Sequence, residues 1–202
     1  MSDKIGEVIE ASTGEFMAQS YQLHWAPPLG SLVKTCVPPE TDCRSNSSIY
    51  GVVCYSSTGS VEPGRHATAR GRDLDEEEDV YKQNPQLARL LSTSFRVLIV
   101  GYGEGSDMRR YLPPRPPRVH AFVYPCSQEE VVGFTQSLDF LNLLLGASLL
   151  IPAEELVAAC LRAASLARQD GRAFLVKAGK ELASLLAGDS ARLSTILRKI
   201  RP

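Results

Sequence analysis

Short apolar runs of the strand type, separated by turn-rich segments, recur in the first 125 residues of the chain and predict β-strands. The clearest runs are Ile49–Tyr55 and Phe95–Tyr102, because both are rich in β-branched and aromatic residues. Further strands are expected at Lys4–Ala11, Glu15–Leu23, Leu32–Val37 and Val119–Tyr124. Turn residues separate these runs and no long helical pattern intervenes, which favours an antiparallel barrel or sandwich over a parallel sheet.

After Pro125 the apolar residues recur every three to four positions, which predicts helices. Ser127 and Glu130 form a capping-box pattern at the start of a helix expected to extend to Gly146. Three further helices are expected to start at Pro152, after Asp170-Gly171 and after Asp189. We therefore predict an α+β protein, with an antiparallel β-barrel in residues 1–125 and a small α-helical module in residues 127–202.

An insertion from about Pro63 to Ser94 interrupts the predicted barrel. Asn84-Pro85 offers an N-cap and a first-turn proline for a short helix over Gln86–Leu91. Upstream of it lies an acidic run that could bind a metal or a basic partner, although such runs are usually solvated loops. Its members are Asp75, Glu76, Glu77, Glu78 and Asp79.

Composition indicates an ordinary globular chain: 202 residues, 44% hydrophobic and 22% charged, with a formal net charge of −1. A bulk attraction to nucleic acid or to an acidic membrane is not indicated. Residues 1–130 hold 13 basic and 17 acidic side chains, and residues 131–202 hold 9 and 6. Met-Ser-Asp-Lys at the start lacks the apolar run of a signal peptide. The apolar stretch Leu138–Ile151 is shorter than the roughly 20 residues that cross a bilayer, so no membrane association is expected.

Five widely spaced cysteines, without a Cys-x-x-Cys pair, argue against a zinc site or a disulfide framework. Reduced thiols in a cytoplasmic protein are expected instead. We expect no bound metal and no cofactor.

The barrel landmarks resemble those of the HAS-barrel, the domain shared by HerA-type DNA-translocating ATPases and the subunits of rotary ATP synthases. The likeness covers roughly residues 4–130. It rests on five short segments: Ile5-Gly6-Glu7-Val8, Pro28-Leu29-Gly30-Ser31-Leu32-Val33, Tyr50-Gly51-Val52-Val53, Val100-Gly101-Tyr102, and Pro113-Pro114-Arg115-Pro116-Pro117 before the last strand. The resemblance implies a barrel that acts as a docking collar for a ring or a partner.

The chain departs from that family where a RecA-like ATPase domain would follow. The Gly-Lys pair of this chain, Gly179-Lys180, lies inside a predicted helix and precedes Glu181. A phosphate-binding loop needs an upstream glycine, a following hydroxyl and a strand-to-helix turn. ATPase activity is therefore not carried over from the resemblance.

Two other motifs have ordinary structural interpretations. Gly101–Ser106 follows a strand but lacks the third glycine of a dinucleotide motif and leads into no predicted helix, so we predict a hairpin turn. His24, His66 and His120 lie far apart in the sequence, and structural or surface roles are expected for them.

The most concentrated basic feature is an arginine segment with one tyrosine among prolines: Arg109, Arg110, Tyr111, Arg115 and Arg118. Our leading hypothesis is a non-enzymatic docking or assembly module whose partner is another protein or a second copy of the chain. This segment and the acidic run would be its contact surfaces. The alternative is an accessory nucleic-acid-binding protein that uses the arginine segment, because arginines beside an aromatic bind phosphates and stack on bases. A small hydrolase assembled from distant loops is the third hypothesis.

Overall fold

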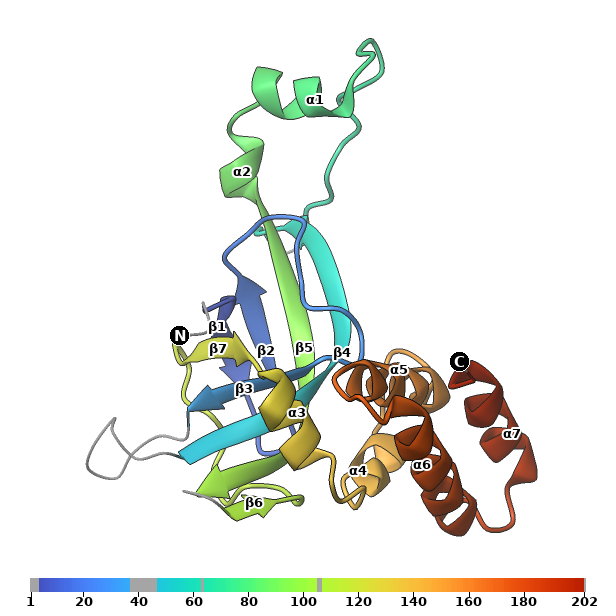
Figure 1. Cartoon of the computed structure of the whole chain (residues 1–202). Helices are drawn as coiled ribbons and strands as arrows, with labels where there is room; N and C mark the ends of the chain where they lie inside the picture. The colour runs from blue at the N-terminus through green and yellow to red at the C-terminus, as the bar shows by residue number, and fades with distance from the viewer. Residues whose placement is uncertain (1–3, 37–46, 63, 105–106, 202) are drawn as a thin grey trace.

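The computed structural model describes residues 4–36, 47–62, 64–104 and 107–201. In these residues the fold is mixed α+β, with seven strands and seven helices (Figure 1). The strands are β1 Gly6–Ala11, β2 Glu15–Ser20, β3 Leu32–Cys36, β4 Ser47–Ser60, β5 Leu91–Glu104, β6 Asp107–Arg109 and β7 Phe122–Pro125.

Six of the strands close into an antiparallel barrel. The hydrogen-bonded order is β2-β1-β7-β3-β4-β5, and β2 also pairs with β5, which joins the two ends. The remaining strand, β6, lies outside the barrel and forms a hairpin with the end of β5. The predicted hairpin is therefore confirmed by the pairing of Glu104 with Asp107, while residues 105 and 106 lie outside the described part of the chain.

The barrel interior is a core of apolar side chains from all six strands. Successive residues of a strand face opposite sides of the sheet, so these inward side chains mostly recur at every second position. The buried members are Val8, Phe16, Ala18, Val33, Ile49, Val53, Phe95, Val97, Ile99, Tyr102 and Val123.

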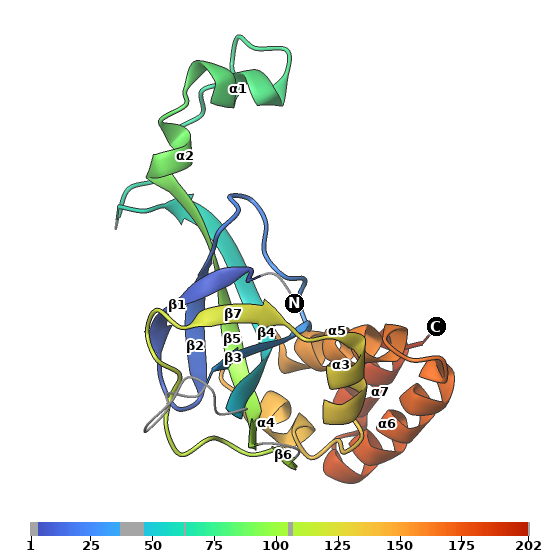
Figure 2. The same cartoon turned by 60° about the vertical axis from the view of Figure 1, so that its left-hand side comes forward.

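Strands β4 and β5 are longer than the sequence predicts. They pair from Ser47–Glu104 to Ser60–Leu91, with register shifts at Tyr50/Gly51 and Val53/Tyr55, whereas we expected Ile49–Tyr55 and Phe95–Tyr102. Residues 55–59 of β4 are exposed on both faces, so the end of this ribbon extends past the barrel without an apolar face. At its tip the ribbon carries an arm (residues 64–90) that projects away from the barrel (Figures 1 and 2).

The arm contains two short helices, α1 Glu77–Gln83 and α2 Leu87–Leu90, and neither buries a residue. The expected helix over Gln86–Leu91 is confirmed in position, but its predicted cap is wrong. Asn84 instead ends α1, where its side chain donates a hydrogen bond to the carbonyl of Val80 (2.9 Å).

Five helices follow the barrel: α3 Gln128–Phe134, α4 Leu141–Gly146, α5 Ala153–Leu166, α6 Gly171–Leu185 and α7 Ser190–Lys199. The capping box of Ser127 and Glu130 at the start of α3 is confirmed, as is the Asp189 cap of α7. The single helix expected from residue 127 to Gly146 is wrong, because the chain turns between α3 and α4. Gly179-Lys180 lies within α6, as predicted.

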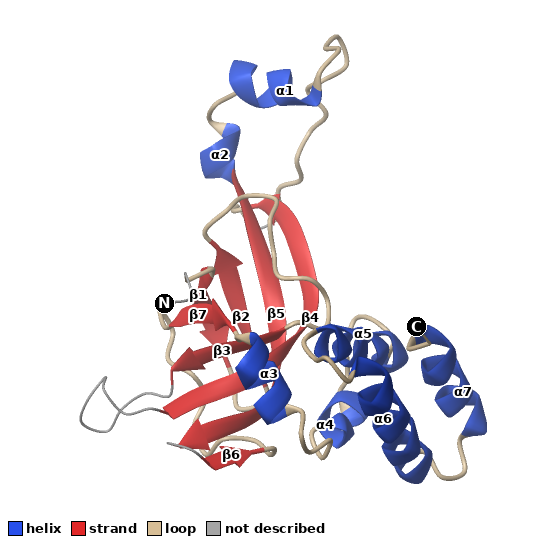
Figure 3. Ribbon diagram, in the orientation of Figure 1, coloured by secondary structure: helices blue, strands red, loops and turns tan. Residues whose placement is uncertain are grey.

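The helices pack on the outer faces of β3, β4 and β5 rather than forming a separate unit (Figure 3). Leu32, Val52 and Val100 from these strands share one buried cluster with helix residues such as Phe134, Leu156 and Leu161. The ion pair of Lys34 on β3 with Glu130 on α3 joins the two parts at the edge of this cluster. The barrel therefore has an apolar core inside and a second one on the helix side.

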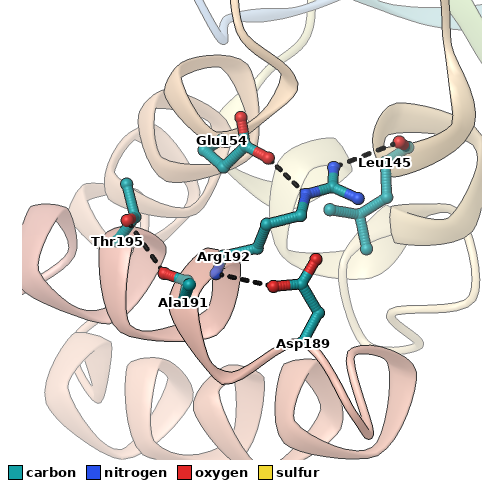
Figure 4. A network of polar contacts seen from close by, with 6 residues as sticks. All are labelled: Leu145, Glu154, Asp189, Ala191, Arg192 and Thr195. Atoms are coloured by element: carbon teal, nitrogen blue, oxygen red, sulfur yellow. Dashed lines mark hydrogen bonds and ion pairs between the residues drawn. The ribbon is translucent and has the colours of Figure 1, made fainter.

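Arg192 attaches the last helix to the rest of the helical module (Figure 4). Its guanidinium donates hydrogen bonds to a carboxylate oxygen of Glu154 on α5 and to the carbonyl of Leu145 on α4 (3.5 Å). The Asp189 side chain accepts from the Arg192 backbone N–H (3.1 Å). These contacts hold α7 on α4 and α5, while Ile196 packs underneath in the shared core.

Candidate interaction surfaces

Arg110 binds the end of helix α3 instead of facing solvent. Its guanidinium donates to the carbonyls of Phe134 (2.8 Å), Gly133 (3.1 Å) and Met108 (3.2 Å). The last carbonyls of a helix have no partner within the helix, and a cation also favours that end of the helix dipole. Arg110 is therefore a cap that ties the end of β6 to α3.

Arg109 is turned towards two tyrosines. It donates to the hydroxyl of Tyr111 (3.0 Å), and its guanidinium lies 5.7 Å from the centre of the Tyr102 ring. Tyr111 is 54% exposed. The structure brings Arg109 and Tyr111 together at the surface and directs the neighbouring Arg110 away from them.

The remaining arginines of the segment lie on the crossover from β6 to β7. Pro113 and Pro117 are buried, whereas Arg115 and Arg118 are exposed. The prolines anchor the crossover and leave these two arginine side chains on its outer side. The crossover leads into β7, the strand that joins β1 and β3 in the barrel.

The acidic run lies in the arm, far from the arginine segment. Asp75 and Glu76 precede α1, and Glu77, Glu78 and Asp79 form its first turn, where carboxylates favour the helix dipole. The arm and β6 lie at opposite ends of β5 (Figures 1 and 2). The structure therefore does not combine the two predicted contact regions into one surface.

A surface that the sequence analysis missed lies on the outside of β1 and β7. His120 adopts a left-handed backbone conformation, with φ of 68°, and its Nδ1–H donates to Oε1 of Glu7 (2.5 Å). Tyr21 donates its hydroxyl to the other oxygen of the same carboxylate (3.1 Å). The carboxylate thus fixes the orientation of the imidazole, whose side chain is 78% exposed. Left-handed backbone is unfavourable for residues other than glycine, so the surrounding contacts must hold His120 in this conformation.

Apolar and aromatic side chains surround this polar cluster. The ammonium of Lys4 lies 4.0 Å from the centre of the Phe122 ring and 5.4 Å from that of Tyr21. We call this surface the β1–β7 face. Contacts join Lys4, Glu7, Tyr21, His120 and Phe122, and the exposed side chains of Ile9 and Val119 lie nearby on the same two segments. Backbone pairing of β1 with residues 120–123 brings these positions together. No sequence motif predicts this face, because Glu7 lies 14 residues from Tyr21 and 113 residues from His120 along the chain.

The carboxyl group of Glu7 provides a direct test of this cluster. The hydrogen bond from His120, followed by that from Tyr21, lowers the pKa of Glu7. We expect the His120→Ala variant to have a higher Glu7 pKa than the wild type, measured by carbon NMR titration of the carboxyl group. A carboxyl pKa lowered by folding adds stability above the unfolded pKa, and that stability is lost as the pH falls through the folded pKa.

The stability that Glu7 contributes is therefore lost as the pH falls from the ordinary glutamate pKa of about 4.3 to lower values. The His66→Ala variant removes an exposed histidine of the arm and should leave the Glu7 pKa unchanged. An equal Glu7 pKa in wild type and His120→Ala would contradict the contact.

The described residues contain no group of three or more His, Cys, Asp or Glu side chains placed to hold a metal ion. None of the described helices combines the length and the apolar composition needed to cross a membrane. No model of a known protein family matches the chain, and no curated protein matches it.

Proposed function

We propose that this chain is a non-enzymatic docking module, a barrel of the HAS type without a motor domain, and that it binds another protein through the β1–β7 face. The observation that carries the proposal is the cluster of exposed aromatic side chains on that face, held in place by Lys4 and Glu7. Tyr21 is 50% exposed and Phe122 39%.

The position of this face supports the proposal. The helices cover β3, β4 and β5, while β1 lies on the side of the barrel away from α5, α6 and α7 (Figure 1). Of β7, the end at Pro125 approaches α5, whereas Phe122 pairs with Glu7 on β1. A partner can therefore approach the face without displacing the helices. In this proposal the helical module stiffens one side of the barrel, and the partner protein binds the β1–β7 face.

The chemistry of the face suits a protein partner. Aromatic residues dominate the binding energy of protein interfaces, and charged groups at the rim add specificity. Contacts within the face hold Tyr21 and Phe122 before binding, which reduces the entropy that each side chain loses on association. Lys4, Glu7 and His120 supply hydrogen-bonding groups beside these two anchors.

Changing two anchors together tests the proposal. We expect the Tyr21→Ser/Phe122→Ser variant to capture at least tenfold less of the partner from an extract of the native cell, because each interface anchor contributes about 2 kcal/mol or more. The amount of each co-purifying protein would be quantified by mass spectrometry. If the partner is a second copy, light scattering would show a dimer that the variant loses.

The matched control changes two exposed apolar residues of the helical module, Leu166→Ser/Val176→Ser. These side chains are 84% and 56% exposed, and the control should capture as much partner as the wild type. Circular dichroism and thermal melting must show that both variants are folded. Equal capture by the two double variants would overturn the β1–β7 face as the docking site.

Nucleic-acid binding is the second candidate, favoured by the pairing of Arg109 with the exposed Tyr111 and by the exposure of Arg115 and Arg118. It requires binding of a labelled single strand that weakens steeply with salt. The Arg115→Gln/Arg118→Gln variant should then bind less tightly. Undetectable binding at low salt would eliminate this candidate.

A further inference from the structure

A cavity of about 180 Å³ lies where the barrel meets the helical module. Its walls come from the turn before β3, the end of β7, and helices α3 and α5. Leu32 and Ala164 form buried parts of the wall, and Cys126 and Val131 are partly exposed at its edge. The cavity is thus reachable from solvent and is bounded by both parts of the protein.

The lining of this cavity is predominantly apolar. Thr135 contributes a hydroxyl group, but that hydroxyl already donates to the carbonyl of Val131 (2.6 Å) and accepts from the guanidinium of Arg168. Cys126 and Cys160 contribute free thiols. Burial raises the pKa of both thiols, that of Cys160 to about 12, so both are neutral at physiological pH. The wall therefore presents neutral groups, and its polar side-chain groups are few: the two thiols and the hydroxyls of Ser31 and Thr135.

We infer that this cavity binds a small, neutral, apolar molecule of roughly six to ten non-hydrogen atoms. An engineered apolar cavity of about 150 Å³ in another protein stays dry and binds benzene or xenon, and the cavity described here is of similar size. The sulfur atoms of Cys126 and Cys160 favour polarisable or aromatic ligands, because sulfur makes attractive contacts with ring edges.

Such a ligand would contact the barrel and the helices at once. Leu32 belongs to β3, Cys126 follows β7, and Ala164 belongs to α5. A ligand that binds only the folded, assembled interface stabilises it by mass action. Occupancy would therefore strengthen the attachment of the helices to the barrel, independently of any partner on the β1–β7 face.

The experiment titrates the full chain with benzene and with indole and follows backbone amides by NMR. We expect saturable shifts of the Leu32, Cys126 and Ala164 amides, and slower alkylation of Cys126 in the presence of ligand. Cys36 is exposed and serves as the internal control, because its alkylation rate should not change. Xenon pressurised into crystals should give a density peak in the cavity.

Filling the cavity should abolish binding. The Ala164→Leu variant is expected to lose at least tenfold in benzene affinity, and Ala163→Leu provides a second test should the first variant fail to fold. Ala173→Leu, on the exposed side of α6, should bind like the wild type. The inference is overturned if no amide shift saturates, if the filled variants bind as well as the wild type, or if crystals show only ordered water in the cavity.

Discussion

The Gly30→Ala variant is expected to be strongly destabilised, because Gly30 lies in a turn packed directly against helix α5. Gly30 is the third residue of a turn closed by the hydrogen bond from Ser31 N–H to the Pro28 carbonyl (3.0 Å). Its φ is +83°. The third residue of a type II turn requires such a positive φ, which glycine adopts without strain. A Cβ at this position would lie 2.5 Å from the backbone of Ala159 and Cys160 on α5.

Two costs add in this variant. A left-handed conformation costs an alanine roughly 1–2 kcal/mol, and overpacking against a rigid backbone costs about 1–3 kcal/mol more. We therefore expect the free energy of unfolding to fall by about 2–5 kcal/mol, measured by urea denaturation. The α5 backbone cannot yield easily, because Leu156, Val157 and Leu161 fix that helix in the core.

Gly64 provides a matched control, since it has a similar φ of +76°, but a Cβ added there would meet no described atom within 4 Å. The Gly64→Ala variant should therefore show only the conformational cost. The difference between the two variants measures the close approach of the turn to α5. Equal destabilisation of the two would mean that the turn does not press against the helix.

The strands that could be predicted from the sequence are those with at least one buried apolar face. Val53 and Val97 face the barrel interior. Val52 and Val100 face the helices, so β4 and β5 form nearly continuous apolar runs in the sequence. The distal half of the β4–β5 ribbon lacks such a face, and its pairing depends on backbone hydrogen bonds and contacts such as Thr58 with Thr93 (2.8 Å). Pairing of this kind leaves no periodic pattern in the sequence.

The break between α3 and α4 was equally invisible, because residues 135–140 contain neither glycine nor proline. The helix ends there through distant contacts. Arg110 and Arg168 donate to the carbonyls of α3, and the turn that follows lets Phe140 enter the core on the outside of the barrel. Tertiary packing overrides the local helical preference in this segment.

The candidate interaction surfaces also depend on tertiary contacts that the sequence does not reveal. The arginine segment could be identified from composition, but side-chain direction could not, so Arg109 and Arg110 looked equivalent. The β1–β7 face depends on Glu7, Tyr21 and His120, which only the closed barrel brings together.

Arg110 is expected to be far more important for stability than its neighbour Arg109. In the Arg110→Ala variant, the carbonyls of Met108, Gly133 and Phe134 lose a charged donor. The contact of the guanidinium with the Phe134 ring, 5.6 Å from its centre, is lost as well. Hydrogen bonds to charged groups contribute about 1.5–3 kcal/mol each and are not additive, so we expect a loss of roughly 2–4 kcal/mol in the free energy of unfolding.

Arg109→Ala is the matched control, because Arg109 is exposed and donates to the exposed hydroxyl of Tyr111. We expect it to cost under about 1 kcal/mol, the range of exposed surface contacts. Arg110→Lys separates charge from geometry. Lysine keeps the charge but cannot reach several carbonyls with one planar group, so this variant should unfold nearly as easily as Arg110→Ala. Full stability of Arg110→Lys would show that Arg110 stabilises the end of α3 through its charge rather than through several directed hydrogen bonds.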